Sequence, residues 1–127
     1  MSVRKVSPGD RAPGDPTSGM VREEAITTEG LWAGYVRTPA GGASGWHHHG
    51  ANQTSVYVVD GVFRVEFGPG GRDVVEGNPG DFVFIPAGTV HRELNPADVE
   101  SHLVVVRAGT DQPTINVDGP EGVQKEA

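Results

Sequence analysis

The alternation of apolar and polar side chains along the middle of the chain predicts short β-strands. From Phe63 to Phe67 every second side chain is apolar, and Arg64 and Glu66 fall on the opposite face. Alternation or a short apolar run predicts further strands over residues 21–26, 31–37, 55–59, 82–85, 89–94 and 99–107. No window longer than one turn has a helical period, so the sequence predicts an all-β protein.

Glycine and proline mark the ends of these strands. Asp60-Gly61 is the signal for a two-residue hairpin, which would pair residues 55–59 with residues 62–67. Further turns are predicted at residues 38–45, 69–71 and 78–80. Many short strands at regular spacing indicate an antiparallel sandwich or barrel.

The length of 127 residues suits a single domain. Residues 1–18 are rich in proline, glycine and charge and are interpreted as a flexible N-terminal arm. The predicted strands place a β-barrel domain over residues 19–110, followed by a polar C-terminal tail over residues 111–127. Within this tail, residues 114–117 are a candidate for a short edge strand.

The charge balance argues against two classes of partner. Ten lysine and arginine residues face 17 acidic ones, a net charge of −7, whereas binding to nucleic-acid phosphates or to an anionic membrane requires a basic surface. The absence of cysteine excludes disulfides, thiolate metal sites and cysteine nucleophiles. No apolar run has the length of a membrane span and no signal peptide is visible, so a cytoplasmic protein is expected.

The histidines are the residues most suggestive of chemistry. Strand alternation puts His47 and His49 on one face and turns His48 away. Two imidazoles at this spacing can reach one metal ion, and antiparallel folding can bring His91 beside them. On spacing alone a polar surface loop is an equal alternative, since histidine-rich tracts are only suggestive of metal binding. His102 precedes an apolar run and is expected to be an ordinary sheet residue.

The stretches around these histidines resemble the two motifs of the cupin superfamily. Residues 80–95 match the second motif, G-x5-P-x-G-x2-H-x3-N, at every fixed position, with His91 as its histidine. The first motif, G-x5-H-x-H-x3-4-E-x6-G, is met in part, by His47, His49 and Gly61. Its glutamate is missing. Counting back from Gly61 puts Thr54 in that place, with Gln53 just before it.

The resemblance implies an antiparallel double-stranded β-helix, or jelly-roll, barrel with one divalent metal ion inside. His47, His49 and His91 would hold the ion. Thr54 is not expected to bind it. Gln53 can offer an amide oxygen, although a role in the loop is favoured because such an oxygen is a poor ligand for softer metals. Iron is expected first, with manganese, nickel, copper and zinc as alternatives, since imidazole suits several metals.

Three functions stay open for such a site. Three neutral imidazoles leave a divalent ion its full charge and open positions, which favours an oxygenase-like enzyme, a dioxygenase, acting on a small anionic organic substrate. A metal-dependent isomerase, lyase or decarboxylase needs the same centre. A cupin that binds a small ligand without catalysis is the third reading.

Two expectations concern the surroundings of the site. Glu93 shares strand parity with His91 and is a candidate general base, with a solvated position at the barrel rim as the alternative. The predicted strand over residues 99–107 has apolar side chains on both faces, and the barrel interior can bury only one of them, so the other face must be covered by something else. A homodimer is therefore expected, although the chain's own terminal segments are an alternative cover.

Overall fold

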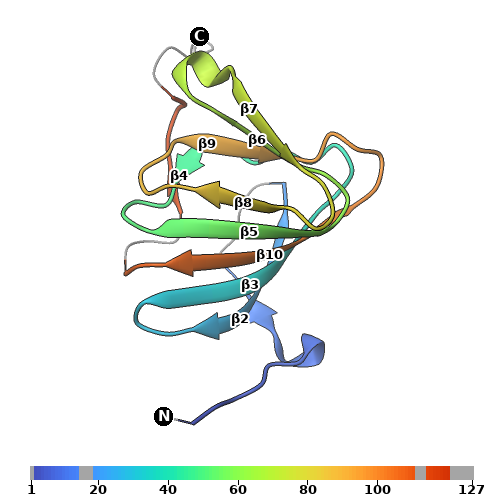
Figure 1. Ribbon diagram of the computed structural model, residues 1–127, viewed down its shortest axis with the longest axis vertical. Helices are drawn as coiled ribbons and strands as arrows, with labels where there is room; N and C mark the ends of the chain where they lie inside the picture. Colours follow the sequence, from blue (N-terminus) through green and yellow to red (C-terminus); the bar gives the residue numbers. More distant parts are fainter. Residues whose placement is uncertain (1, 15–18, 111–113, 121–127) are drawn as a thin grey trace.

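The computed structural model describes residues 2–14, 19–110 and 114–120, and their regular structure is almost entirely β (Figure 1). A six-stranded antiparallel sheet has the order β1-β2-β3-β10-β5-β8. Its strands are β1 (Ala12–Pro13), β2 (Val21–Thr27), β3 (Leu31–Thr38), β10 (Ser101–Ala108), β5 (Gln53–Asp60) and β8 (Phe82–Ile85). The described residues include no α-helix, only the 3₁₀ turns η1 (Pro8–Asp10) and η2 (Pro69–Gly71).

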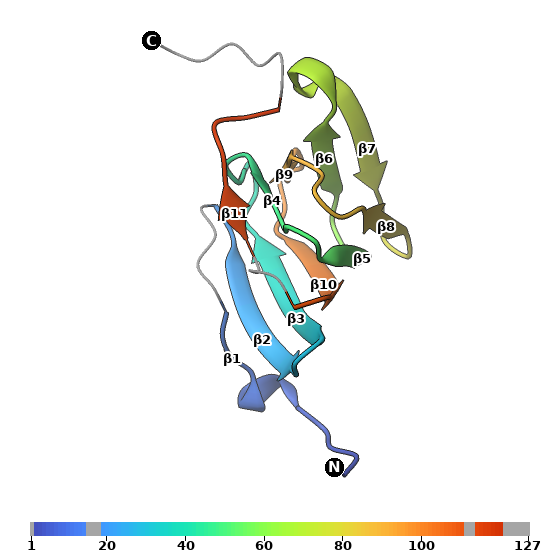
Figure 2. The same cartoon turned by 90° about the vertical axis from the view of Figure 1, so that its left-hand side faces the viewer.

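A second, five-stranded sheet has the order β11-β4-β9-β6-β7. Its strands are β11 (Ile115–Asn116), β4 (His47–His48), β9 (His91–Leu94), β6 (Phe63–Phe67) and β7 (Asp73–Gly77). In both views β6 and β7 lie toward one end of the molecule and β1 and β2 toward the other (Figures 1 and 2). The two antiparallel sheets form the double-stranded β-helix that the sequence predicts.

The core lies between the sheets and follows from strand alternation. The inward side chains of five strands form one buried apolar cluster. Its members are Val36, Val56, Val58, Phe63, Val65, Val83, Ile85, Leu103 and Val105. Burying each such side chain contributes roughly 1.5–3 kcal/mol before the entropy of ordering is subtracted. Alternate outward positions, such as Arg64 and Tyr57, stay partly exposed.

The predicted hairpin at Asp60-Gly61 is wrong. The turn exists, but β5 pairs with β10 and β8, whereas β6 pairs with β9 and β7 in the other sheet. Gly61 has a φ of +78°, and a Cβ atom there would lie 2.8 Å from the Cα of Ser101. The chain therefore passes close to the start of β10 as it crosses between sheets. A local turn signal cannot specify this, because long-range pairing decides which sheet each strand joins.

Strand β7 was not predicted from the sequence. Its residues do not alternate, and four of the five are exposed. Pairing with β6, from Phe63↔Gly77 to Phe67↔Asp73, makes it a strand. At its end Gly77 lies so close to the core that a Cβ atom would be 3.0 Å from both Val58 and Val83.

The terminal segments contact the sheets where the structure describes them. Ala12 and Pro13, within the expected flexible arm, pair with Glu24 and Glu23 of β2. The C-terminal edge strand is β11, at the place that the sequence indicates, and it pairs with β4. Residues 15–18, 111–113 and 121–127 of the expected arm and tail lie outside the described residues. In the described part of the chain no helix has the length and apolar composition of a membrane span.

Candidate metal centre

Three histidines from two strands and one loop converge between the sheets. His47 on β4 is the register partner of His91 on β9, and His49 follows β4 directly. The three side chains are buried, with 1%, 3% and 0% of the residue exposed for His47, His49 and His91. The ring centroids lie 4.4–5.1 Å apart. One ring nitrogen from each can be chosen so that all three lie within 4.8 Å of one another.

The backbone sets which nitrogen of two rings faces the centre. His47 Nδ1 donates to the carbonyl of Gly45 at 2.9 Å, and His91 Nδ1 donates to that of Thr89 at 2.8 Å. A carbonyl oxygen only accepts, so both Nδ1 atoms carry the hydrogen. In the neutral rings each Nε2 keeps its lone pair, and neither Nε2 has a hydrogen-bond partner among the described residues. Such orientation of imidazoles by a carbonyl is typical of metal ligands, so these residues fit a divalent ion.

The other two histidines lie elsewhere. His48 is half-buried and its Nδ1 accepts a hydrogen bond from the backbone N–H of Gly50, 3.0 Å away. His102 lies 2.7 Å from the hydroxyl of Tyr35 and 3.1 Å from the carboxylate of Glu100. Alternation therefore separates His48 from its two neighbours, and His102 is a sheet residue as expected.

The position of the missing motif glutamate faces the interior. Thr54 is 1% exposed on the inner face of β5, and its hydroxyl has no hydrogen-bond partner among the described residues. Gln53 is exposed, on the opposite face of the same strand. The structure thus turns the amide oxygen of Gln53 away from the histidines. The family position on β5 holds a hydroxyl in place of a carboxylate.

A carboxylate nevertheless lies beside the histidines. Glu93 is 5% exposed, and its Oε2 is 3.2 Å from His47 Nε2 and 4.0 Å from Arg22 Nη2. Ser44 holds its backbone through hydrogen bonds of 3.0 Å to the Glu93 N–H and 2.8 Å to its carbonyl. The alternative of a solvated rim position for Glu93 is therefore wrong. The β9 strand turns this side chain inward with His91.

The charges around the site act on one another. Burial alone would raise the pKa of the Glu93 carboxyl, but the hydrogen-bonding contact with His47 and the neighbouring His91 and Arg22 outweigh burial and hold that pKa below the usual range. Burial lowers the pKa of His91, although the charge of Glu93 opposes this. Glu93 is thus an anion at neutral pH, and a neutral His91 is favoured, the state that binds a cation.

Sequence reasoning did not single out Arg22. Arg22 is only 7% exposed. Strand alternation places it on the same face as Glu24 and Ile26, and this mixed pair does not indicate whether that face is buried. The register of β2 against β3 also shifts between Glu24 and Ile26, so parity does not persist along this strand. The only feature of the sequence that could have drawn attention to Arg22 is an arginine in a predicted strand that has no apolar face.

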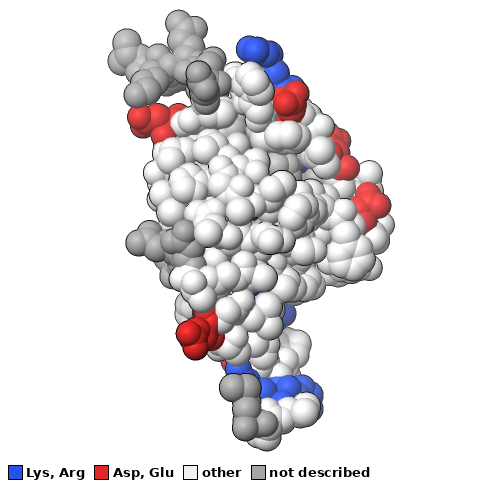
Figure 3. Space-filling view, turned by 60° about the vertical axis from the view of Figure 1, so that its left-hand side comes forward, with Lys and Arg blue, Asp and Glu red and all other residues white. Residues whose placement is uncertain are grey.

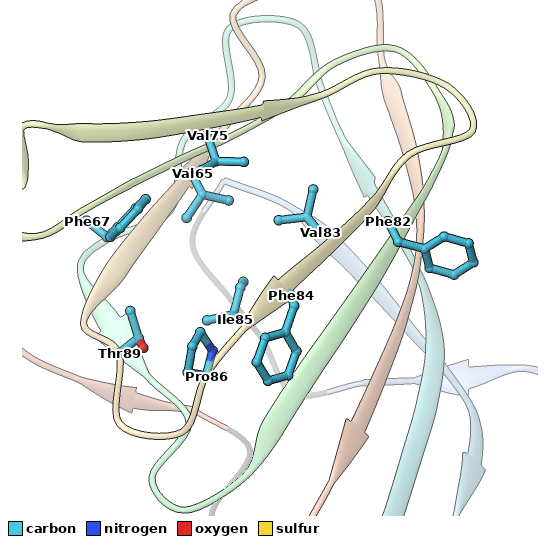
Figure 4. Close-up of a pocket in the computed structure, with 9 residues that line it drawn as sticks. All are labelled: Val65, Phe67, Val75, Phe82, Val83, Phe84, Ile85, Pro86 and Thr89. Atoms are coloured by element: carbon cyan, nitrogen blue, oxygen red, sulfur yellow. The ribbon is translucent and has the colours of Figure 1, made fainter.

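An apolar groove of about 300 Å³ opens between β8 and the second sheet (Figure 4). Its lining residues are Val65, Phe67, Val75, Phe82, Val83, Phe84, Ile85, Pro86 and Thr89. Phe67 is the register partner of His91, and Ile85 is that of Thr54, so the groove adjoins the strands that carry the site. Figure 3 shows one face of the molecule, on which charged side chains lie mainly at the margins.

Comparison with known proteins places this geometry in context. A model of the cupin domain family matches residues 34–107. The structure is similar to the polyketide cyclase RemF from Streptomyces resistomycificus, with a TM-score of 0.74 and 19% identity over 91% of this chain and 86% of that one. It is also similar to KdgF from Halomonas sp., with a TM-score of 0.71 and 23% identity over 85% of this chain and 94% of that one.

An oxalate oxidase is also similar, with a TM-score of 0.66 and 21% identity over 84% of this chain and 60% of that one. No curated protein sequence matches the chain. At these identities the structural likeness shows the fold and carries no statement about the reaction.

Proposed function

Because this chain belongs to the cupin family, whose model matches residues 34–107, we propose that it is a metal-dependent enzyme with one divalent ion per chain. His47, His49 and His91 hold the ion. The observation that carries the proposal is the convergence of these buried imidazoles, two of them with Nδ1 already bonded to a carbonyl. Burying unpaired ring nitrogens is costly, and a cation in the centre removes that cost.

We favour iron(II) and an oxygen-dependent reaction of a small anionic organic substrate. An ion held by imidazoles keeps positions open for a substrate anion and for oxygen, and iron supplies the electron transfer that oxygen chemistry requires. The apolar groove beside β8, which adjoins the strands that carry the site, has the volume for the substrate's carbon skeleton. Manganese, nickel, copper and zinc fit the same imidazoles.

A second candidate is a metal-dependent isomerase, lyase or decarboxylase. The observation that favours it is Glu93, a buried carboxylate 3.2 Å from His47. A carboxylate in this place can take a proton from a substrate carbon or hydroxyl without any oxidant. Ligand binding without catalysis is the outcome left if neither reaction is found.

The test starts from protein purified without added metal. We expect about one equivalent of a divalent metal by elemental analysis, and loss of that metal in His91→Ala. Enolisable diketones, thiols and hydroxy acids are then screened in an oxygen electrode, with the His91→Ala protein as control. Oxygen uptake that depends on substrate and metal supports the oxygenase. Equal turnover under strict anaerobiosis favours the second candidate, and absence of metal after reconstitution contradicts both.

A further inference from the structure

Two acceptor atoms face each other in the buried centre. His47 Nδ1 donates its hydrogen to Gly45, so Nε2 of the neutral ring presents a lone pair. Glu93 Oε2, also an acceptor, lies 3.2 Å from it. Neither atom has a hydrogen-bond partner among the described residues, and both side chains are at least nine-tenths buried. Two lone pairs at this distance repel, so the arrangement requires a positive charge between them, either a proton or a metal ion.

The distance matches two ligands of one metal ion. Atoms about 2.1 Å from an ion in tetrahedral or octahedral geometry are about 3.0–3.4 Å apart. Ligand atoms of the three histidines lie within 4.8 Å of one another, whereas no oxygen of Glu93 lies within that distance of all three, so Glu93 adjoins the group at His47. Ser44 holds the backbone of Glu93, so binding the same ion requires the carboxylate to turn toward the other histidines about its side-chain torsions.

The need for a carboxylate at the metal centre also favours Glu93 as a ligand. The first cupin motif asks for a carboxylate on β5, where this chain has Thr54, with an inward hydroxyl. Glu93 supplies a buried carboxylate from β9, in the facing sheet. Arg22 lies 4.0 Å from the same oxygen, beyond hydrogen-bond range and at the limit of an ion pair, so it does not by itself satisfy this carboxylate.

We propose that Glu93 is the carboxylate ligand of the metal centre, in place of the glutamate that the motif has on β5. This inference rests on the proposed function, because it assumes that the histidines bind an ion. It changes the expected charge: a divalent ion with one carboxylate keeps a net charge of +1, next to the cationic Arg22. A substrate carboxylate or enolate is then held by the ion and the guanidinium together.

The test measures cobalt(II) and zinc(II) binding by chelator competition, together with the visible spectrum of the cobalt form. We expect Glu93→Gln to weaken binding at least about tenfold and to alter the cobalt spectrum, because a neutral amide replaces an anionic carboxylate ligand. Adding Thr54→Glu to that variant restores the carboxylate at the motif position and is expected to recover affinity. Glu66→Gln, on the outer face of β6, is the matched control and leaves affinity unchanged.

The outcomes separate the two proposals. If the wild type binds neither metal, the proposed function fails. If the wild type binds and Glu93→Gln has the same affinity and spectrum, only the role of Glu93 is overturned. Should Glu93→Gln fail to fold, a crystal structure of the zinc-loaded wild type decides. A Glu93 oxygen about 2.0–2.2 Å from zinc supports the inference. A carboxylate whose two oxygens both lie too far from zinc to bind it overturns the inference.

Discussion

Individual side chains in this protein are directed by strand alternation and by the backbone carbonyls next to them. His47 and His49 are buried, whereas His48 between them is half-buried and contacts Gly50. Asn95, the last residue of the second motif, serves the fold. Its Nδ2 donates to the carbonyls of Thr38 at 3.0 Å and Val99 at 2.7 Å, which ties the end of β3 to the turn before β10.

The different directions of His48 and His49 give a prediction. His49→Ala removes a nitrogen from the centre and is expected to lower the bound metal from about one equivalent to a small fraction, since removing a ligand costs at least about tenfold in affinity. His48→Ala is expected to retain the wild-type metal content. Elemental analysis of the two purified variants, folded by circular dichroism, makes the comparison. Equal losses would show that His48 contributes to the centre as much as His49 does.

At the scale of elements, strands β6 and β9 are joined on their outer face by charge. Glu66 accepts hydrogen bonds from Arg64 Nε at 3.0 Å and from Arg92 Nε at 2.7 Å. Burial works to raise the pKa of the Glu66 carboxyl, but the bonds from Arg92 and Arg64 outweigh burial and lower the pKa. The ionised carboxylate therefore stabilises the pairing of two strands, one of which carries His91.

This pKa shift sets how stability depends on pH. The folded pKa of Glu66 lies below its unfolded value, so its contribution is present above that value, near 4.5, and is lost as the pH falls through the folded pKa. Glu66→Gln is expected to reduce the free energy of unfolding at pH 7 by about 1 kcal/mol. The difference from the wild type should shrink below pH 4. Urea unfolding at several pH values measures it, and a difference that grows in acid would contradict the assignment.

The whole molecule leaves an apolar edge uncovered. Phe82 and Phe84 on β8 are 74% and 60% exposed, and Tyr57 packs against Phe82 on the same outer face. Strand β8 ends the order of its sheet, so its outer edge is unpaired among the described residues. The outer face of β10 is partly covered, since Val104 is half-buried and Val106 is 36% exposed. Exposed edges with large apolar residues favour association.

We therefore propose a homodimer that buries the β8 edge. Light scattering at micromolar concentration is expected to give twice the mass of one chain. Phe82→Lys combined with Phe84→Lys places charge on the edge and should yield the monomer. Retained metal content in this variant controls for folding, since both side chains point away from the histidines. A monomeric wild type would contradict the proposal.

The sequence by itself determined the local geometry and the cupin motifs. Alternation has a period of two wherever a strand forms, so the separation of His48 from His47 and His49, and the common face of Phe63, Val65 and Phe67, followed from residue order. The second motif identified His91 as the distant partner, and the register of β4 against β9 places it opposite His47.

Only the tertiary structure decided which face is inside and which strands pair. Asp60-Gly61 gave the turn, but the sheet that β6 joins depends on its pairing with β9 and β7. Parity grouped Glu93 with His91 without showing that both are buried beside Arg22. Burial of a charged side chain is settled by contacts between distant strands, and these carry no local pattern that residue order could reveal.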